Sequence, residues 1–245
     1  MHLRYEPLSE QHIIDTFSEM SSRYEKLMDH ELGLFWGYRY QEFVEAFLQT
    51  FQIKKGQTVL DIATGTGAIP ANLLARQDGN RKIVGLDLTF RMLEQAKTRL
   101  QEIEGGKDMA LVCGSAEALP FRKQAFDHIL CCLATHHIPI ESLLSNIRRV
   151  KKENREGLAS IADVGGSSKW KIGIIRLVIK ILAFLYFLVF ENFSRAMAES
   201  DALQNVRTAA EWVETVNKSG FAEVKVEELP SRRMWAPNPI IIQFY

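Results

Sequence analysis

The sequence predicts a single α/β domain built on a doubly wound, mostly parallel sheet of seven strands. Two observations lead to this fold class. Short apolar segments alternate with amphipathic helical ones, and a glycine turn follows the first apolar segment. Strands that are apolar throughout are typical of a parallel sheet that helices cover on both faces. A chain of 245 residues is long enough for one such domain with added segments.

The expected elements follow in order along four parts of the chain. Residues 1–51 form a helical cap, in which Phe43, Val44, Phe47 and Leu48 recur at helical spacing. The core, 52–164, has strands at 58–64, 82–88, 109–115, 126–134 and 157–164, with helices at 69–77, 91–103 and 141–152. Residues 165–206 are an inserted helical segment, and 207–245 hold a helix at 209–220 and strands at 221–229 and 239–245.

The composition excludes several classes of protein. Thirty basic and thirty acidic residues cancel, so we expect no nucleic-acid partner. Cys113, Cys131 and Cys132 lack the spacing of metal ligands, so we expect free thiols, which favours a reducing compartment. The first residues lack a basic-then-apolar signal peptide, so a cytoplasmic location is expected.

The glycine turn "DIATGTGAIP", residues 61–70, does not match a dinucleotide-binding loop. Pro70 stands where the third glycine of that fingerprint belongs, and the Asp61 carboxylate would repel a pyrophosphate. A cationic adenosyl cofactor with an amino-acid tail and no phosphate fits better. Asp87 ends the second strand, where an acid hydrogen-bonds ribose hydroxyls in related folds. The alternatives are a helix N-cap for Asp61 and a turn role for Asp87.

The motifs "VLDIATGTG", "IVGLDLTFRMLEQA", "GSAEALPF" and "FDHILCCLATHHI" resemble those of class I S-adenosylmethionine-dependent methyltransferases. The segment "FSEMSSRYEKLMDHELGLFWGYRY" is similar to the branch that methylates ubiquinone and menaquinone precursors on carbon. The resemblance implies a Rossmann-like fold, S-adenosylmethionine as cofactor, and methyl transfer, at carbon, to an apolar small molecule that is aromatic, prenylated or otherwise lipid-like. Transfer to oxygen, a step other than methylation, and cofactor binding without catalysis are the alternatives.

The resemblance also implies a set of cofactor-binding residues. The glycine turn would hold the methionine part through Asp61, Ala63, Thr64, Gly65 and Gly67. Asp87 would take the ribose hydroxyls, and the adenine would lie on Leu88 and Met92. The remaining contacts would come from Tyr24, Ala116, Cys132 and Leu133. Ser115 departs from the family, which has an aspartate there for the adenine amino group.

Candidate catalytic residues lie in "THHIP", after the fourth strand. His136 or His137 could deprotonate a phenol or enol, with packing as the alternative. No metal site is expected, because no third ligand has suitable spacing. Asp163 ends the fifth strand at a family position near the acceptor, although it could instead orient the glycine turn that follows. An apolar acceptor pocket would draw its walls from Phe35, Trp36 and Tyr38, unless these simply pack.

The segment 172–190 is almost wholly apolar and would span about 28 Å as a helix, at about 1.5 Å per residue. Arg176 and Lys180 interrupt it, each costing about 2.5–3.5 kcal/mol at a membrane centre. Together with Lys169, they are expected to share one helical face. Three alternatives remain: a lid over the acceptor with peripheral membrane contact through 169–190, a core helix, and a transmembrane span.

Overall fold

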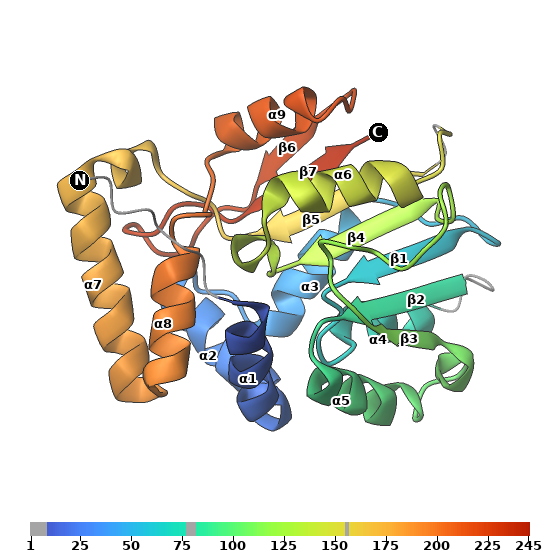
Figure 1. The fold of residues 1–245 in the computed structure, drawn as a ribbon, viewed down its shortest axis with the longest axis horizontal. Coiled ribbons are helices and arrows are strands. Elements are labelled where there is room, and N and C mark those ends of the chain that lie inside the picture. Colours follow the sequence, from blue (N-terminus) through green and yellow to red (C-terminus); the bar gives the residue numbers. More distant parts are fainter. Residues whose placement is uncertain (1–8, 77–81, 155–156) are drawn as a thin grey trace.

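A computed structural model describes residues 9–76, 82–154 and 157–245. Its centre is a seven-stranded sheet in the order β3-β2-β1-β4-β5-β7-β6 (Figure 1). The strands are β1 (Thr58–Ile62), β2 (Lys82–Asp87), β3 (Ala110–Cys113), β4 (His128–Cys132), β5 (Ala159–Asp163), β6 (Lys225–Glu228) and β7 (Ile240–Phe244). β7 pairs antiparallel with both β5 and β6, and the other pairs of neighbouring strands are parallel. The predicted mostly parallel sheet is therefore confirmed.

Helices cover both faces of the sheet (Figure 1). One face carries α3 (Tyr40–Gln49), α4 (Ala68–Ala75) and α5 (Phe90–Leu100), and the other carries α6 (Ile140–Val150) and α9 (Ala209–Lys218). The strands serve both layers because successive side chains point to opposite faces. In β1, Val59 packs with α3 and α4, whereas Leu60 and Ile62 pack with α6 and α9.

The strand order reverses between β1 and β4, and this places a crevice at the carboxyl ends of these strands. The turn after β1 opens there, β2 ends at Asp87, and β5 ends at Asp163. Open α/β sheets bind their ligands at such a reversal point. The fold thus brings the glycine turn, both carboxylates and the histidine segment to one edge of the sheet.

Two groups of helices lie beyond this edge. The N-terminal cap contains α1 (Glu10–Met20), a 3-10 turn (Ser21–Arg23) and α2 (Tyr24–Phe35). The insertion after β5 contains a 3-10 turn (Ser168–Lys171), α7 (Gly173–Phe190) and α8 (Phe193–Ala202). Helix α1 contacts both α5 and α8, so it bridges the sheet and the insertion. The predicted cap and helical insertion are confirmed, although residues 1–8 of the cap lie outside the described residues.

Several local expectations were wrong. Lys169 lies in the 3-10 turn before α7, so only Arg176 and Lys180 share a helical face. The first strand ends at Ile62 instead of 64, because Ala63 has a positive φ of 54°. The helix expected over 69–77 ends at Ala75, and Gln77 lies outside the described residues.

Helix α7 is also not a core helix, since Phe187 is its one buried residue. Within the part of the chain described, it is the one helix long and apolar enough to cross a membrane.

Candidate functional site

A cavity of about 850 Å³ opens at the carboxyl ends of the strands. This volume lies in the range of small-molecule sites, about 300–1,000 Å³. Most of the expected cofactor-binding residues line it, namely Tyr24, Ala63, Gly65, Asp87, Leu88, Met92, Ser115, Ala116, Cys132 and Leu133. They come from five separate stretches of the chain, which the strand order brings together.

Asp61, Thr64 and Gly67 lie behind the glycine turn and do not line this cavity. Asp61 is 1% exposed, and its Oδ2 accepts a hydrogen bond of 2.6 Å from Thr64 Oγ1. Burial raises the pKa of the Asp61 carboxyl to about 7, against the effect of that hydrogen bond. A Cβ on Gly67 would lie 3.1 Å from the Cβ of Ala96, so this glycine lets α4 pack closely on α5. These residues shape the turn from beneath.

The Asp87 carboxylate fastens the glycine turn to the end of β2. Its Oδ2 accepts from the Gly65 N–H at 2.8 Å, and its Oδ1 accepts from the Thr89 N–H at 2.8 Å. Gly65 has a positive φ of 54°, which favours glycine there. Burial raises the pKa of Asp87 to about 6, although both backbone hydrogen bonds oppose the shift. Each carboxylate oxygen has a second lone pair and can accept a further hydrogen bond from a ligand in the cavity.

Helix α1 brings another carboxylate, Glu10, to the wall of the same cavity. Ser115 Oγ donates to Glu10 Oε1 at 2.6 Å and accepts from the Glu117 N–H at 3.1 Å. Burial and the nearby Glu10 charge raise the pKa of Glu117. Sequence reasoning missed Glu10, because 105 residues separate it from Ser115 and no motif contains it. A carboxylate is therefore present beside Ser115 after all.

His136 and His137 lie on a 3-10 turn, Thr135–His137, that follows β4. His136 Nδ1 lies 2.7 Å from Asp163 Oδ1, and the His136 N–H donates to Asp163 Oδ2 at 3.2 Å. Burial opposes ionisation of Asp163, but His136 and hydrogen bonds from Thr135 and Val164 outweigh it and lower its pKa. Burial likewise disfavours the charged imidazole, but Asp163 outweighs burial and raises the pKa of His136.

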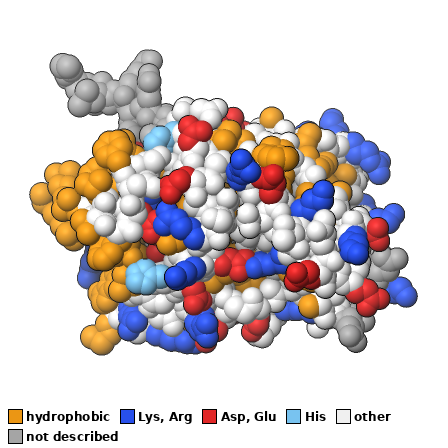
Figure 2. Space-filling model, turned by 90° about the horizontal axis from the view of Figure 1, so that it is seen from below, with side chains coloured by type: hydrophobic (Ala, Val, Ile, Leu, Met, Phe, Trp, Pro, Cys, Tyr) orange, Lys and Arg blue, Asp and Glu red, His pale blue; other side chains and the backbone are white. Residues whose placement is uncertain are grey.

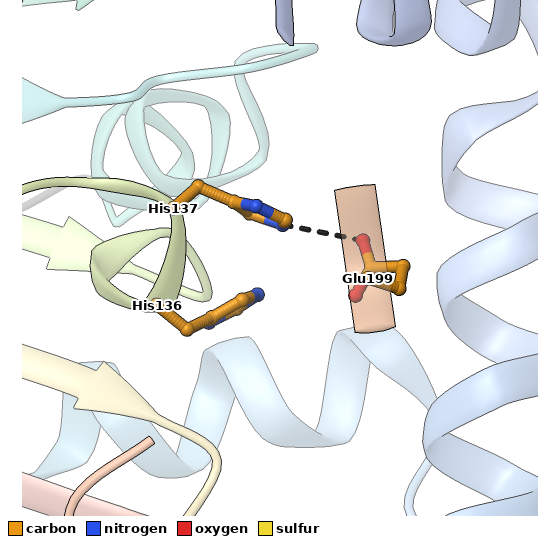
Figure 3. A group of neighbouring side chains, drawn as sticks. All are labelled: His136, His137 and Glu199. Carbon is orange, nitrogen blue, oxygen red and sulfur yellow. Dashed lines mark ion pairs between the residues drawn. The ribbon is translucent and has the colours of Figure 1, made fainter. Parts of the chain in front are cut away.

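The other face of the histidine pair meets Glu199 of α8 (Figure 3). Arg195 lies one turn before Glu199 on the same helix. His137 Nε2 is 3.2 Å from Glu199 Oε1, and Arg195 Nη1 is 2.8 Å from the same oxygen. Arg195 Nη2 also lies 3.2 Å from Glu31 Oε2 of α2. Burial opposes ionisation of Glu199, but Arg195 and His137 outweigh it and lower its pKa. Burial and the neighbouring His136 lower the pKa of His137.

Glu199 corrects the expectation that the histidines have no third ligand, because α8 brings it close from 62 residues away. The ligand atoms of His136, His137 and Glu199 all lie within 4.8 Å of one another (Figure 3). A metal ion would nevertheless meet the Arg195 guanidinium, which keeps its positive charge in proteins. This repulsion argues against a divalent cation, and we assign no metal to the cluster.

A second cavity, of about 470 Å³, lies between the N-terminal cap and the insertion. Its walls are mostly apolar and aromatic, and they include Met28, Leu32, Phe35, Trp36, Ile179, Leu182, Tyr186, Phe187 and Trp235. Arg195 and Glu199 are among its polar residues. Phe35 and Trp36 thus border a cavity, whereas Tyr38 packs in the core and donates to the Pro230 carbonyl at 2.7 Å.

The two cavities share part of their walls. Both are bordered by Phe17, Tyr24, Leu133, His136, His137 and Ala202. Asp163 lines neither cavity and contacts His136 from behind. The histidine turn therefore stands between a cavity bordered by a glycine turn and one bordered by aromatic side chains.

Comparison with known proteins agrees with this architecture. A methyltransferase-domain family model matches residues 59–154. A demethylmenaquinone methyltransferase of Lactobacillus johnsonii is 24% identical over 230 residues, covering 90% of this chain and 88% of that protein. The ubiquinone/menaquinone biosynthesis C-methyltransferase UbiE of Paracoccus denitrificans is 32% identical over 135 residues, covering 55% of this chain and 52% of that protein.

Solved structures share the fold. The S-adenosylmethionine-dependent methyltransferase from Aquifex aeolicus superposes with a TM-score of 0.60 and 18% identity, covering 91% of this chain and 97% of that one. The domain match, the relatives and the strand order agree on one assignment. The chain is a class I S-adenosylmethionine-dependent methyltransferase that resembles the ubiquinone and menaquinone C-methyltransferases.

Proposed function

We propose that the protein transfers a methyl group from S-adenosylmethionine to a carbon atom of an apolar aromatic acceptor that bears an ionisable hydroxyl group. The observation that carries this proposal is the shared wall between two cavities of different character. Donor and acceptor must meet in contact for a direct displacement, and adjoining cavities provide that geometry. The names of two relatives, which act on menaquinone and ubiquinone precursors, support an apolar ring as acceptor.

The residues of the first cavity fit the cofactor. Asp87 offers both carboxylate oxygens to the ribose hydroxyls, and Leu88 and Met92 offer apolar contact to the adjoining adenine. Glu10 and Ser115 offer oxygens to the adenine amino group. The backbone of Ala63 and Gly65 borders the space left for the methionine part. When bound, S-adenosylmethionine supplies an electrophilic methyl group.

His136 is the general base in this proposal. Asp163 is ionised and only accepts hydrogen bonds, so the neutral form of His136 carries its proton on Nδ1 and leaves a lone pair on Nε2. Because the pKa of His136 is raised, this neutral form, and with it the reaction rate, increases as the pH rises through that pKa. The Nε2 nitrogen takes the proton of the acceptor hydroxyl, which enriches the neighbouring ring carbon in electrons. After that carbon has received the methyl group it loses its own hydrogen as a proton and the ring hydroxyl is restored, so the reaction releases one proton in total. Asp163 is a positioning residue that also stabilises the imidazolium. Such a base contributes about 10²–10⁴-fold to the rate.

Arg195 is the residue that would receive the acceptor oxygen. Its side chain is 4% exposed, and its Nε has no hydrogen-bond partner in the described part of the chain. The guanidinium lies over the rings of Phe17 and Phe187, with 5.4 Å from Cζ to each centroid. Its two terminal nitrogens pair with Glu199 and Glu31, so the Nε–H is the donor left for an acceptor oxygen that gains charge during the reaction.

The test is a single-turnover reaction with methyl-¹³C-labelled S-adenosylmethionine and a short-chain 1,4-naphthohydroquinone. We expect the demethylated cofactor to appear together with a ring carbon that bears the label in the NMR spectrum. His136→Gln should slow the reaction at least 100-fold, whereas exposed His30→Gln should leave it unchanged. A label on oxygen would contradict the carbon assignment, and no demethylated cofactor would contradict methyl transfer to this class.

A further inference from the structure

Helix α7 turns a continuous apolar stripe toward solvent. Its outward residues recur at intervals of three and four, as the members of one helical face do: Ile174, Leu177, Val178, Ile181, Leu182, Leu185, Leu188 and Val189. Their exposed fractions run from 40% at Leu188 to 73% at Val189. Figure 2 shows hydrophobic side chains gathered at the end of the molecule where Figure 1 places α7. A stripe of this length on a soluble surface indicates an interaction site.

The opposite side of α7 belongs to the second cavity. This side packs along α8 and contributes Ile179, Ala183, Tyr186 and Phe187 to the cavity wall. One helix therefore separates the proposed acceptor cavity from the outer surface. Leu182 belongs to both, since it lines the cavity and is 61% exposed.

Two further apolar residues extend the stripe beyond α7. Met234 is fully exposed and Trp235 is 64% exposed, both in the loop before β7. Trp235 contacts Phe35 with ring centroids 5.9 Å apart, and Phe35 contacts Tyr186 of α7 at 5.3 Å. The loop therefore lies next to the C-terminal half of α7, and a tryptophan stands at the edge of the apolar surface. We call the stripe together with Met234 and Trp235 the apolar face.

The charged side chains on the segment that carries this face are all cationic. Residues 168–190 contain Lys169, Lys171, Arg176 and Lys180 and no acidic residue. Arg232 and Arg233 are exposed beside Met234 at the other edge. Three of these cations also have acidic partners: Lys171 with Glu211, Lys180 with Asp201 and Arg232 with Glu42. An apolar face with a cationic rim is typical of helices that lie in the interface of an anionic bilayer.

The surroundings of α7 argue for an orientation in the membrane plane. Its inner side is held along α8, and Lys180 Nζ lies 3.5 Å from Asp201 Oδ1 of that helix. At its C-terminal end, Glu191 pairs with Arg23 of the cap at 2.8 Å. A transmembrane orientation would break these contacts and expose the second cavity. In the plane, only the apolar face enters the lipid.

We propose that the apolar face docks on an anionic lipid bilayer and that the acceptor reaches the second cavity from the lipid, between α7 and the loop that carries Trp235. The docking stands on the surface alone. The route of the acceptor rests on the proposed function. This route explains why the proposed cavity for an apolar ring lies directly behind an exposed apolar helix.

The test uses the full chain and flotation with vesicles of phosphatidylcholine, alone or with 30% phosphatidylglycerol. The variant is the triple substitution Ile174→Glu, Ile181→Glu and Val189→Glu, at outward positions that do not line either cavity. Glutamate has a good helix propensity, so α7 should remain folded. Phe90→Glu is the matched control, because Phe90 is 63% exposed on α5, far along the chain from this face.

We expect the wild type and Phe90→Glu to float with the anionic vesicles, more weakly at high salt, and the triple variant to bind at least tenfold less. Unchanged binding of the triple variant, or no binding of the wild type, would overturn the docking. A concentration-dependent dimer that the triple variant dissociates, without vesicle binding, would assign the face to a second copy instead. The triple variant should still transfer a methyl group to a water-soluble acceptor. This activity assay therefore tests the proposed function independently of the vesicle-binding assay.

Discussion

Replacing Asp163 by asparagine probes the proposed base directly. Asp163 is 2% exposed and accepts from Thr135 Oγ1, the His136 N–H, His136 Nδ1 and the Val164 N–H. An asparagine keeps one oxygen, so its amide group must face two of these donors. Breaking a buried charge pair costs about 3–5 kcal/mol. For a protein of this size, that loss lowers Tm by about 6–20 °C.

The kinetic effect follows from the same contacts. When the asparagine amide faces Nδ1, this nitrogen must accept, and the proton moves to Nε2, where the lone pair was needed. We expect kcat to fall by about 10²–10⁴-fold, the contribution of a general base. The affinity for S-adenosylmethionine should change less than about threefold by calorimetry. Asp163 does not line the cofactor cavity.

The pH dependence supplies a second readout for Asp163→Asn. The raised pKa of His136 contributes stability below its unfolded pKa of about 6.5, and this is lost as the pH rises through the folded value. The lowered pKa of Asp163 contributes stability above about 3.9, and this is lost as the pH falls through the folded value. The stability deficit of the variant should therefore be larger at pH 5.5 than at pH 8.5.

Asp127→Asn is the control for this experiment. Asp127 is also buried and hydrogen-bonded, but it lies beside the amino end of β4, opposite the site. Its substitution should lower Tm and leave kcat and its pH profile unchanged. If Asp163→Asn kept kcat within about twofold with an unchanged profile, the reasoning about His136 would be refuted.

Three further predictions concern the two cavities. Asp87→Asn should weaken S-adenosylmethionine binding at least tenfold. It should also abolish the rise in affinity that we expect between pH 5 and pH 7, where Asp87 ionises with its pKa of about 6. An unchanged affinity by calorimetry would show that Asp87 does not bind the ribose. Glu10→Gln should weaken S-adenosylmethionine binding about three- to tenfold at constant Tm, whereas equal affinity would make the contact with Ser115 purely structural. Arg195→Lys keeps the charge but loses the planar donor, so the acceptor KM should rise about tenfold with cofactor affinity unchanged; an unaltered KM would place the acceptor oxygen elsewhere.

Much of the fold follows from local sequence. The strands of the sheet are short apolar runs, and their alternation with amphipathic helices predicts a mostly parallel sheet covered on both faces. The spatial order of the strands, with β7 antiparallel between β5 and β6, was not predicted from this alternation. The glycine turn and Asp87 could be placed at one edge because parallel strands end together. Most of the motif residues named from the sequence line the first cavity, whereas Asp61, Thr64 and Gly67 lie behind the turn. Their contacts with the cofactor stay a prediction.

The contacts made by the added helices could not be predicted in the same way. Glu10 meets Ser115, and Glu199 and Arg195 meet the histidine turn, across 58 to 105 residues without a spacing rule to connect them. In "FSRAMAESDA" the polar residues read as an ordinary amphipathic helix, and only tertiary packing buries Arg195 and Glu199. The exposure of one face of α7 could not be predicted either, because hydropathy does not show which side of a helix other elements cover.

The central claim is that cofactor and acceptor occupy adjoining cavities at the same time, and a calorimetric titration tests it most directly. The protein is first saturated with S-adenosylhomocysteine and then titrated with a short-chain 1,4-naphthoquinone. We predict one equivalent of each ligand, with quinone affinity equal to or greater than that of the free protein, and loss of quinone binding alone when Leu32→Trp fills the second cavity. Competition between the two ligands, or quinone binding that Leu32→Trp leaves intact, would contradict the account.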